Sequence, residues 1–112
     1  MRLWIDDIRE MPSDFDIWAK TANEAIIHLK TNKITFVSFD HDLGVGMDGN
    51  DVAKFIECLA HDGQINRLKW QIHSQNPVGR DRILVSMNKA DEHWEANEQL
   101  SAMISLTAQD CI

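Results

Sequence analysis

The sequence predicts an α/β fold with a mainly parallel sheet, and three observations support this prediction. Short apolar runs typical of buried strands alternate with segments in which apolar residues recur at helical spacing. One helical segment begins with a capping box, and another ends at a glycine. Strands that alternate with helices usually pair in parallel, because each helix returns the chain to the start of the next strand.

The first third of the chain predicts two strands and a helix. Leu3-Trp4-Ile5 predicts the first strand, and residues 8–14 predict a loop because they contain Pro12. Residues 15–19 predict a second strand, although their alternation is imperfect. Thr21-Ala22-Asn23-Glu24 has the spacing of a capping box, so a helix is expected to begin there. Its inward stripe is Ala22, Ala25, Ile26 and Leu29.

The middle of the chain repeats this alternation. Residues 34–39 predict a third strand, and a loop with three glycines follows at residues 43–49. Asn50 or Asp51 can cap the next helix, which is expected to end at Gly63. Its inward stripe is Val52, Phe55, Ile56 and Leu59.

A fourth strand at residues 68–72 and a helix at about residues 78–87 complete the predicted domain. Ile83, Leu84 and Met87 are expected to face inward from that helix. We therefore assign residues 1–90 to the α/β domain and residues 91–112 to a C-terminal extension, helical or partly disordered. Packing on the domain, contact with a second copy in a homo-oligomer, and fraying are all compatible with this extension.

Composition and charge narrow the function classes. The 112 residues are 44% hydrophobic and 26% charged, as in an ordinary soluble domain. We expect a cytoplasmic protein without membrane contact, because no apolar run approaches the roughly 20 residues of a membrane helix. Asp6 and Asp7 also interrupt any signal-peptide core. The net charge of −7 argues against a long nucleic-acid tract as partner, but not against a small phosphate ligand.

Polar clusters follow three of the predicted strands. Asp6-Asp7 follows the first, Asp40-His41-Asp42 the third, and His73-Ser74-Gln75-Asn76-Pro77 the fourth. In an open parallel sheet the carboxyl ends of the strands lie at one edge, where ligands bind. We therefore expect a functional site at this edge.

The carboxylates of Asp6, Asp7, Asp40 and Asp42 form a candidate metal site. Clustered carboxylates repel one another, and a bound cation or a raised pKa relieves that repulsion. Oxygen ligands suit divalent cations such as Mg²⁺ or Mn²⁺. The simpler alternative is a pair of solvated turn residues at each strand end.

His41 and His73, together with Asp40, are the candidate catalytic residues. Two imidazoles at neighbouring strand ends suit a general acid and a general base on opposite sides of a phosphorus atom. The alternative is that each histidine is hydrogen-bonded for structural reasons.

Ser74, Asn76 and Arg80 are the candidate phosphate-binding residues. Ser74 can donate a hydrogen bond to phosphate, and Arg80 at a helix start can bind two phosphate oxygens. Asn76 before a proline also favours a turn. Arg9 and Arg82 are weaker candidates for binding phosphate.

The order of these clusters resembles that of bacterial response-regulator receiver domains. Those domains have an acidic pair after strand one, an aspartate after strand three and Ser or Thr after strand four. Asp6-Asp7, Asp40 and Ser74 take these places, and Met47-Asp48-Gly49 resembles the loop after the phosphoacceptor aspartate. Two features differ, because no strand ending in lysine follows Ser74 and the first helix is shortened to a loop.

The chain resembles more closely the cyclic-phosphate processing receiver domains, a receiver-derived family of bacteria and phages. The patterns L-W-L-D-D-x-R, S-x-D-H-D-L-G and H-S-x-N-P-x-G-R are similar to residues 3–9, 38–44 and 73–80. The resemblance covers about residues 1–90. It implies a receiver-like, flavodoxin-like three-layer fold with a reduced four-stranded sheet that lacks the fifth strand, followed by the C-terminal extension.

The same resemblance implies phosphoesterase-like processing of a cyclic phosphate, in a nucleotide or at a nucleic-acid end, with Mg²⁺ or Mn²⁺ as the expected cofactor. One alternative is a non-catalytic module that sequesters a nucleotide or contacts a host protein. Another is a degenerate receiver domain phosphorylated on Asp40. Turnover of a cyclic nucleotide separates the first hypothesis from the second, and labelling by a small-molecule phosphodonor identifies the third.

Overall fold

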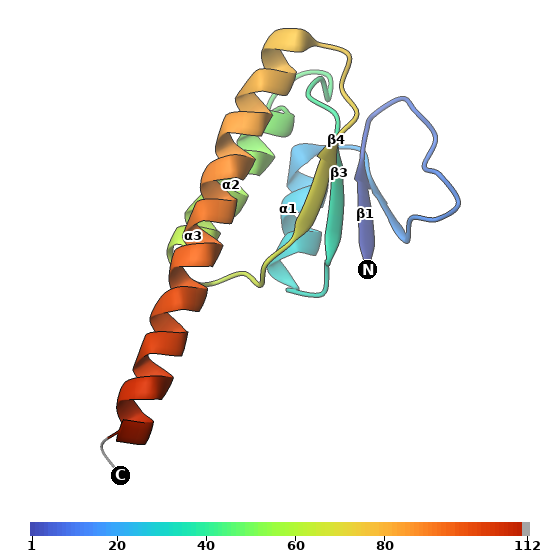
Figure 1. The fold of residues 1–112 in the computed structure, drawn as a ribbon. Coiled ribbons are helices and arrows are strands. Elements are labelled where there is room, and N and C mark those ends of the chain that lie inside the picture. Colours follow the sequence, from blue (N-terminus) through green and yellow to red (C-terminus); the bar gives the residue numbers. More distant parts are fainter. Residues whose placement is uncertain (111–112) are drawn as a thin grey trace.

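The computed structural model describes residues 1–110, which form four strands and three helices (Figure 1). Their order is β1 (Arg2–Ile5), β2 (Ile17–Ala19), α1 (Ala22–Lys30), β3 (Phe36–Phe39), α2 (Gly49–His61), β4 (Lys69–Ile72) and α3 (Pro77–Asp110). The predicted α/β class, the reduced four-stranded sheet and the C-terminal helix are confirmed.

The sheet has the strand order β2-β1-β3-β4, and all three neighbouring pairs are parallel. Backbone hydrogen bonds continue past the strand ends: Asp40 N donates to the carbonyl of Ile5 (2.9 Å), and His73 N donates to that of Phe39 (2.9 Å). Asp6 N likewise donates to the carbonyl of Ala19 (3.1 Å). The sheet therefore holds the first residue after β1, β3 and β4 at one edge.

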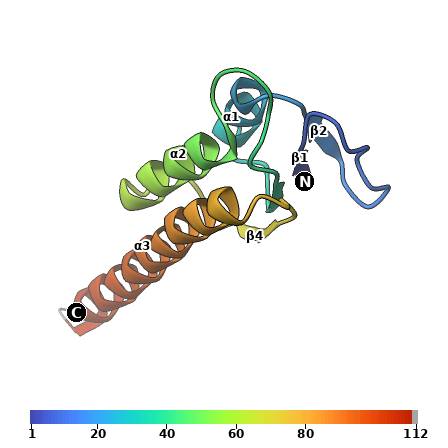
Figure 2. The same ribbon diagram turned by 90° about the horizontal axis from the view of Figure 1, so that it is seen from above.

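The three helices lie on one side of the sheet, and the β1–β2 segment lies on the other (Figures 1 and 2). Helix α1 connects β2 to β3, and α2 connects β3 to β4, so both connections run in the same direction across the sheet. Because such connections are right-handed, both helices lie on the same face. On the opposite face, Phe15 packs edge-on against Trp4 and Phe36, with ring centroids 5.2 and 5.9 Å apart. The outer layer on that side is thus a loop, as Pro12 predicted.

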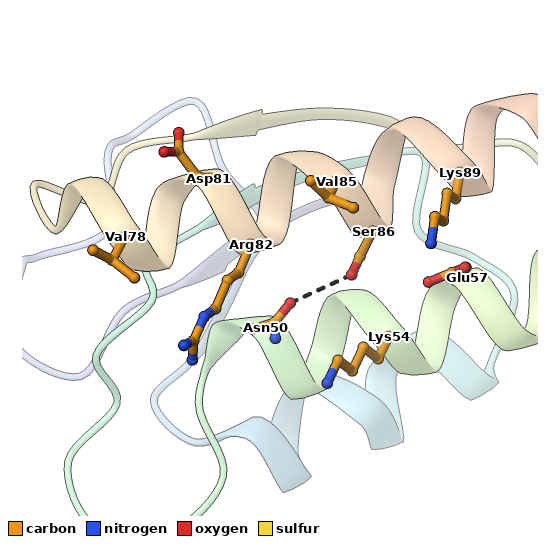
Figure 3. Close-up of a pocket in the computed structure, with 9 residues that line it drawn as sticks. All are labelled: Asn50, Lys54, Glu57, Val78, Asp81, Arg82, Val85, Ser86 and Lys89. Atoms are coloured by element: carbon orange, nitrogen blue, oxygen red, sulfur yellow. Dashed lines mark hydrogen bonds between the residues drawn. The ribbon is translucent and has the colours of Figure 1, made fainter.

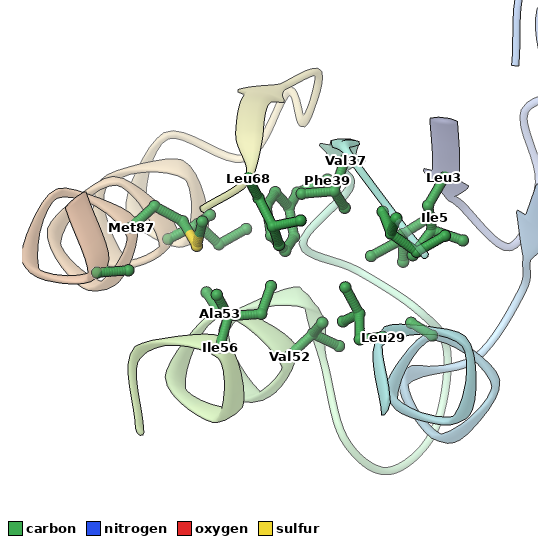
Figure 4. Close-up of a cluster of buried hydrophobic side chains, with 14 of the residues drawn as sticks. Leu3, Ile5, Leu29, Val37, Phe39, Val52, Ala53, Ile56, Leu68 and Met87 are labelled. Atoms are coloured by element: carbon green, nitrogen blue, oxygen red, sulfur yellow. The ribbon is translucent and has the colours of Figure 1, made fainter. Parts of the chain in front are cut away.

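The hydrophobic core fills the space between the sheet and the helices (Figure 4). Its fully buried side chains include Leu3, Ile5, Val37 and Phe39 from the sheet and Leu29, Val52, Ile56, Ile83 and Met87 from the helices. The inward stripes predicted from periodicity are mostly confirmed. The prediction for Leu84 was wrong: this side chain is 41% exposed, because Ile83, Met87 and Ala90 form the inward stripe of α3.

Helix ends follow the capping chemistry of the sequence, with one correction. Thr21 Oγ1 accepts a hydrogen bond from Glu24 N (3.1 Å), which confirms the predicted start of α1. For α2 the N-cap is Asp48, neither Asn50 nor Asp51. Asp51 lies three residues further on and completes a reciprocal capping box, so the acidic side chain stabilises the helix start from inside the first turn.

Helix α3 passes residue 90 without a break, and part of its C-terminal half still packs on the domain. Trp94 is buried and donates through Nε1 to the carbonyl of Ile65 (3.0 Å), and Asn97 Nδ2 donates to that of Ala60 (2.9 Å). Residues 98–105 are exposed, and the helix gives the molecule its elongated shape of 57 × 27 × 20 Å. Residues 111 and 112 of the expected extension lie outside the described residues.

None of the described helices combines the length with the apolar composition that a membrane span requires.

Candidate functional site

Three carboxylates meet at the carboxyl edge of the sheet. Asp6 and Asp7 follow β1, and Asp40 follows the neighbouring strand β3. Each offers one oxygen atom, and these three atoms lie within 4.8 Å of one another. We call these residues the acidic cluster. In the part of the chain that the structure describes, Asp42 is not a member of it.

Asp6 is the fixed member of the acidic cluster. Its side chain is 1% exposed, and Oδ1 accepts hydrogen bonds from the backbone N–H groups of Ile8 (2.9 Å) and Arg9 (2.8 Å). The other oxygen, Oδ2, accepts from His73 Nε2 (2.9 Å). Three donors from two segments therefore hold this carboxylate in one orientation.

Asp7 and Asp40 have much less support from the protein. Asp40 Oδ1 accepts one hydrogen bond, from His41 N (2.9 Å). Among residues 1–110, the Asp7 carboxylate has no hydrogen-bond or ion-pair partner, and no Lys or Arg forms an ion pair with any of the three carboxylates. The negative charge of the cluster is thus under-compensated, which is a condition that favours a bound cation.

The pKa of the Asp40 carboxyl reflects the same imbalance of charge. Burial raises the pKa of this carboxyl, and the nearby charge of Asp6 raises it further. The His41 N–H, the His73 ring and the Arg9 guanidinium act in the opposite direction without cancelling the increase. The oxygen donors, their spacing and this raised pKa together fit a divalent cation such as Mg²⁺.

His73 is the last member of a hydrogen-bond chain on the helix-free face of the sheet. Gln71 Nε2 donates to Ser38 Oγ (3.0 Å), and Ser38 Oγ, which is fully buried, lies 2.7 Å from His73 Nδ1. If the Ser38 hydroxyl donates to Nδ1, the ring proton is on Nε2 and is donated to Asp6. The ring also stacks on Trp4, with centroids 3.9 Å apart and planes 4° apart.

Burial lowers the pKa of His73, and the hydrogen bond to Asp6 offsets this only in part. A neutral ring with one nitrogen accepting from Ser38 and the other donating to Asp6 has both nitrogens engaged within the protein. This geometry suits His73 to orienting Asp6, and the proton transfer expected from the sequence stays a prediction.

His41 connects the β3–α2 loop to the start of α3. Its Nδ1 lies 3.0 Å from Asp42 Oδ1, and its Nε2 lies 3.2 Å from Asp48 Oδ2, within ion-pair distance but without hydrogen-bond geometry. A Cβ atom added at Gly79 would lie 2.2 Å from His41 Cγ. The ring therefore packs directly on the backbone of the first turn of α3.

The predicted phosphate-binding residues have local roles at the start of α3. Asn76 Oδ1 accepts from Gly79 N (3.1 Å), as an N-cap side chain does, and Asn76 Nδ2 also contacts Asp42 (3.4 Å). Ser74 Oγ is buried and accepts from Asn76 N (3.2 Å), and its hydroxyl proton remains available for donation. One Arg80 nitrogen, Nη1, donates to the carbonyl of Ile72 (2.9 Å).

Arg9 is the arginine whose charge acts on the site. Its Nη1 donates to the carbonyl of His73 (2.8 Å), so the side chain reaches from the β1–β2 loop to the end of β4. Its positive charge lowers the pKa of both Asp40 and His73. Trp4 Nε1 donates to the Arg9 carbonyl (3.1 Å) and supports this loop. Arg82, in contrast, lines a groove between α2 and α3.

From the sequence, Arg80 is a stronger candidate than Arg9, and Ser38 and Gln71 are not candidates at all. The alternation of side chains along a strand could have identified them. Gln71 in β4 and His73 just after it point to the same face of the sheet, and Ser38 lies opposite Gln71 on β3. A serine within a strand pattern does not by itself indicate a functional role.

The fold and the acidic cluster define a receiver-like α/β domain, with acidic residues after β1 and β3 and a serine after β4. A model of the cyclic-phosphate processing receiver domain family matches residues 1–89 of the chain. The chain belongs to this family, which confirms the predicted resemblance. A search of curated proteins and a search of solved structures each found no match.

Proposed function

We propose that the domain hydrolyses a cyclic phosphodiester, in a nucleotide or at the end of a nucleic acid, at the edge that carries the acidic cluster. The observation that supports this most is the convergence of Asp6, Asp7 and Asp40 without a compensating ion pair, next to the charge of Arg9. Family membership connects the domain with cyclic phosphates but leaves the reaction to be tested.

The acidic cluster is the proposed holder of Mg²⁺ or Mn²⁺. Asp6 contributes an oriented carboxylate, whereas Asp7 and Asp40 contribute oxygens that the protein leaves largely free. When bound, such an ion supplies charge neutralisation and polarises a phosphoryl oxygen. Asp42, which meets His41 and Asn76, supports the loop around the cluster in this proposal.

In the proposed reaction, a water oxygen forms a bond to phosphorus while the bond between phosphorus and one ring oxygen breaks. Asp40 accepts the proton of the attacking water. The leaving oxygen takes a proton from solvent, and the product is a phosphomonoester with a free hydroxyl group. Arg9 and the Ser74 hydroxyl bind the non-bridging oxygens, with Arg80 as a further phosphate contact.

The test is a turnover assay of the purified chain on 2′,3′-cyclic nucleotides, RNA with a cyclic-phosphate end, and cyclic dinucleotides, with and without Mg²⁺. Formation of a phosphomonoester is followed by ³¹P NMR. We expect Asp40→Asn to lower kcat by about 10²- to 10⁴-fold, because it removes the proton acceptor. Asp62→Asn is the matched control, since Asp62 caps the other end of α2 and is exposed.

Two other results would contradict hydrolysis. A cyclic nucleotide that raises the melting temperature without any product would indicate a sequestering module. Labelling of Asp40 by a small-molecule phosphodonor, without turnover of any cyclic phosphate, would indicate a signalling receiver domain.

A further inference from the structure

A row of exposed residues runs along α3, separate from its buried face. The residues recur every three or four positions and so lie on one side of the helix. We call this row the α3 stripe; it comprises Val78, Arg82, Val85, Lys89, Glu92, Ala96, Leu100 and Met103. All of them are exposed, including Val85 (55%) and Leu100 (56%).

The N-terminal half of the α3 stripe forms one wall of a groove between α2 and α3 (Figure 3). The groove has a volume of about 540 Å³. Val78 and Val85 provide its apolar surface, and the hydrogen bond from Ser86 Oγ to Asn50 Oδ1 (3.3 Å) joins its two walls. Its lining residues on α3 run from Val78 to Lys89, about three helical turns, so a rod-shaped partner such as a helix can lie along it.

Charge is distributed unevenly along α3. Residues 77–89 contain three basic residues and one acidic residue, whereas residues 90–110 contain five acidic residues and neither Lys nor Arg. The groove is lined by three basic side chains, Lys54, Arg82 and Lys89, and by two acidic ones, Glu57 and Asp81, so its net charge is positive. In the described part of the chain, none of the three basic side chains forms a hydrogen bond or ion pair. The groove is therefore complementary in charge to the C-terminal half of the same helix.

We propose that the groove is occupied by α3 of a second copy of this chain, in antiparallel orientation. A two-fold axis between residues 90 and 91 places Lys89 opposite Glu92 of the second copy, and Val85 opposite Ala96 of the second copy. The same register places Val78 opposite Met103 of the second copy. Each contact occurs twice because the interface is isologous.

Three properties of α3 favour a second copy as the occupant. Antiparallel pairing puts each acidic half against the basic groove of the other copy, whereas parallel pairing would oppose like charges. The 34 residues extend about 50 Å, enough for an interface of about 1,000 Å² or more. The small Ala96 side chain also lets the two helices approach closely where it faces Val85.

The first test is the mass of the full chain in solution, measured by sedimentation equilibrium. We expect a reversible dimer that weakens as NaCl is raised, and Ala96→Arg should raise its Kd about a hundredfold or more. Ala102→Arg, exposed on α3 but outside the α3 stripe, should leave Kd unchanged. Circular dichroism confirms that each variant is folded. A monomer at about 1 mM, or equal effects of the two variants, would overturn the proposal.

The second test is specific for the register. Lys89→Glu and Glu92→Lys should each raise Kd about tenfold, because each places like charges together twice. An equimolar mixture of the two variants should restore dimerisation, since only the mixed dimer pairs opposite charges at both positions. In a parallel dimer Lys89 would face Lys89 and Glu92 would face Glu92, so either substitution would only replace one pair of like charges with another. A rise in Kd for either variant therefore excludes a parallel dimer. Absence of rescue in the mixture would overturn the antiparallel register.

Discussion

At the scale of single residues, His73 shows how its surroundings determine what a titratable side chain can do. The ring is stacked on Trp4 and joins Ser38 to Asp6 through its two nitrogens. A histidine ring that accepts one hydrogen bond and donates another within the protein, and whose pKa is lowered, is suited to holding a carboxylate in place. We therefore propose that His73 positions Asp6.

Replacement of His73 tests this role. His73→Ala should lower the free energy of unfolding by about 2–4 kcal/mol, because it leaves a cavity beside Trp4 and a buried carboxylate without its donor. It should also weaken the binding of Mg²⁺ about tenfold or more. Gln71→Ala, which removes only the first donor of the chain, should have a smaller effect on both. Unchanged Mg²⁺ affinity in a folded His73→Ala variant would contradict the positioning role.

The lowered pKa of His73 also predicts a dependence of stability on pH. Between the folded pKa and the ordinary value of 6.5, the unfolded chain binds more protons than the native protein. The contribution of His73 to stability is therefore complete above pH 6.5 and is lost as the pH falls toward the folded pKa. Urea unfolding across this range should show a steeper loss for the wild type than for His73→Gln. Parallel curves would contradict the assignment.

At the scale of elements, the site depends on how closely the β3–α2 loop approaches the start of α3. The sequence predicted the strands, the start of α1 and the glycine-rich loop, because these follow from local spacing and turn chemistry. It did not identify Asp48 as the N-cap of α2 or the packing of His41 on Gly79, because both depend on contacts across the fold. Asn76 was expected to shape a turn, and it does so by capping α3.

A double-mutant cycle tests the contact between His41 and Gly79. Gly79→Ala should lower the free energy of unfolding by about 1–3 kcal/mol, because the new Cβ overlaps the His41 ring. In a His41→Ala background the same substitution should be neutral or stabilising, because alanine favours a helix over glycine by about 1 kcal/mol. Denaturant unfolding of the four proteins measures the coupling. Equal effects in the two backgrounds would show that the ring does not occupy this space.

At the scale of the whole molecule, parallel strand order explains why the location of the site could be predicted. Adjacent parallel strands bring Asp6 and Asp40 to one edge whatever the details of packing. Which aspartates belong to the acidic cluster and which support the loop was harder to predict, because this depends on the direction in which each side chain points. The course of α3 beyond residue 90 also could not be predicted, since Trp94 and Asn97 pack on groups distant in sequence.

We propose that the acidic cluster binds a divalent cation, and thermal unfolding with and without Mg²⁺ tests this most directly. Because the pKa of Asp40 is raised from its ordinary value of 3.8, native stability falls as the pH rises from 3.8 to the folded pKa and stays at that lower level above it. At neutral pH without Mg²⁺, Asp40→Asn should therefore melt a few degrees above the wild type.

Mg²⁺ should raise the melting temperature of the wild type and of the Asp62→Asn control, and should have little effect on Asp40→Asn. If Mg²⁺ stabilised none of the three proteins, or stabilised Asp40→Asn as much as the wild type, the acidic cluster would not be the cation site proposed for this domain.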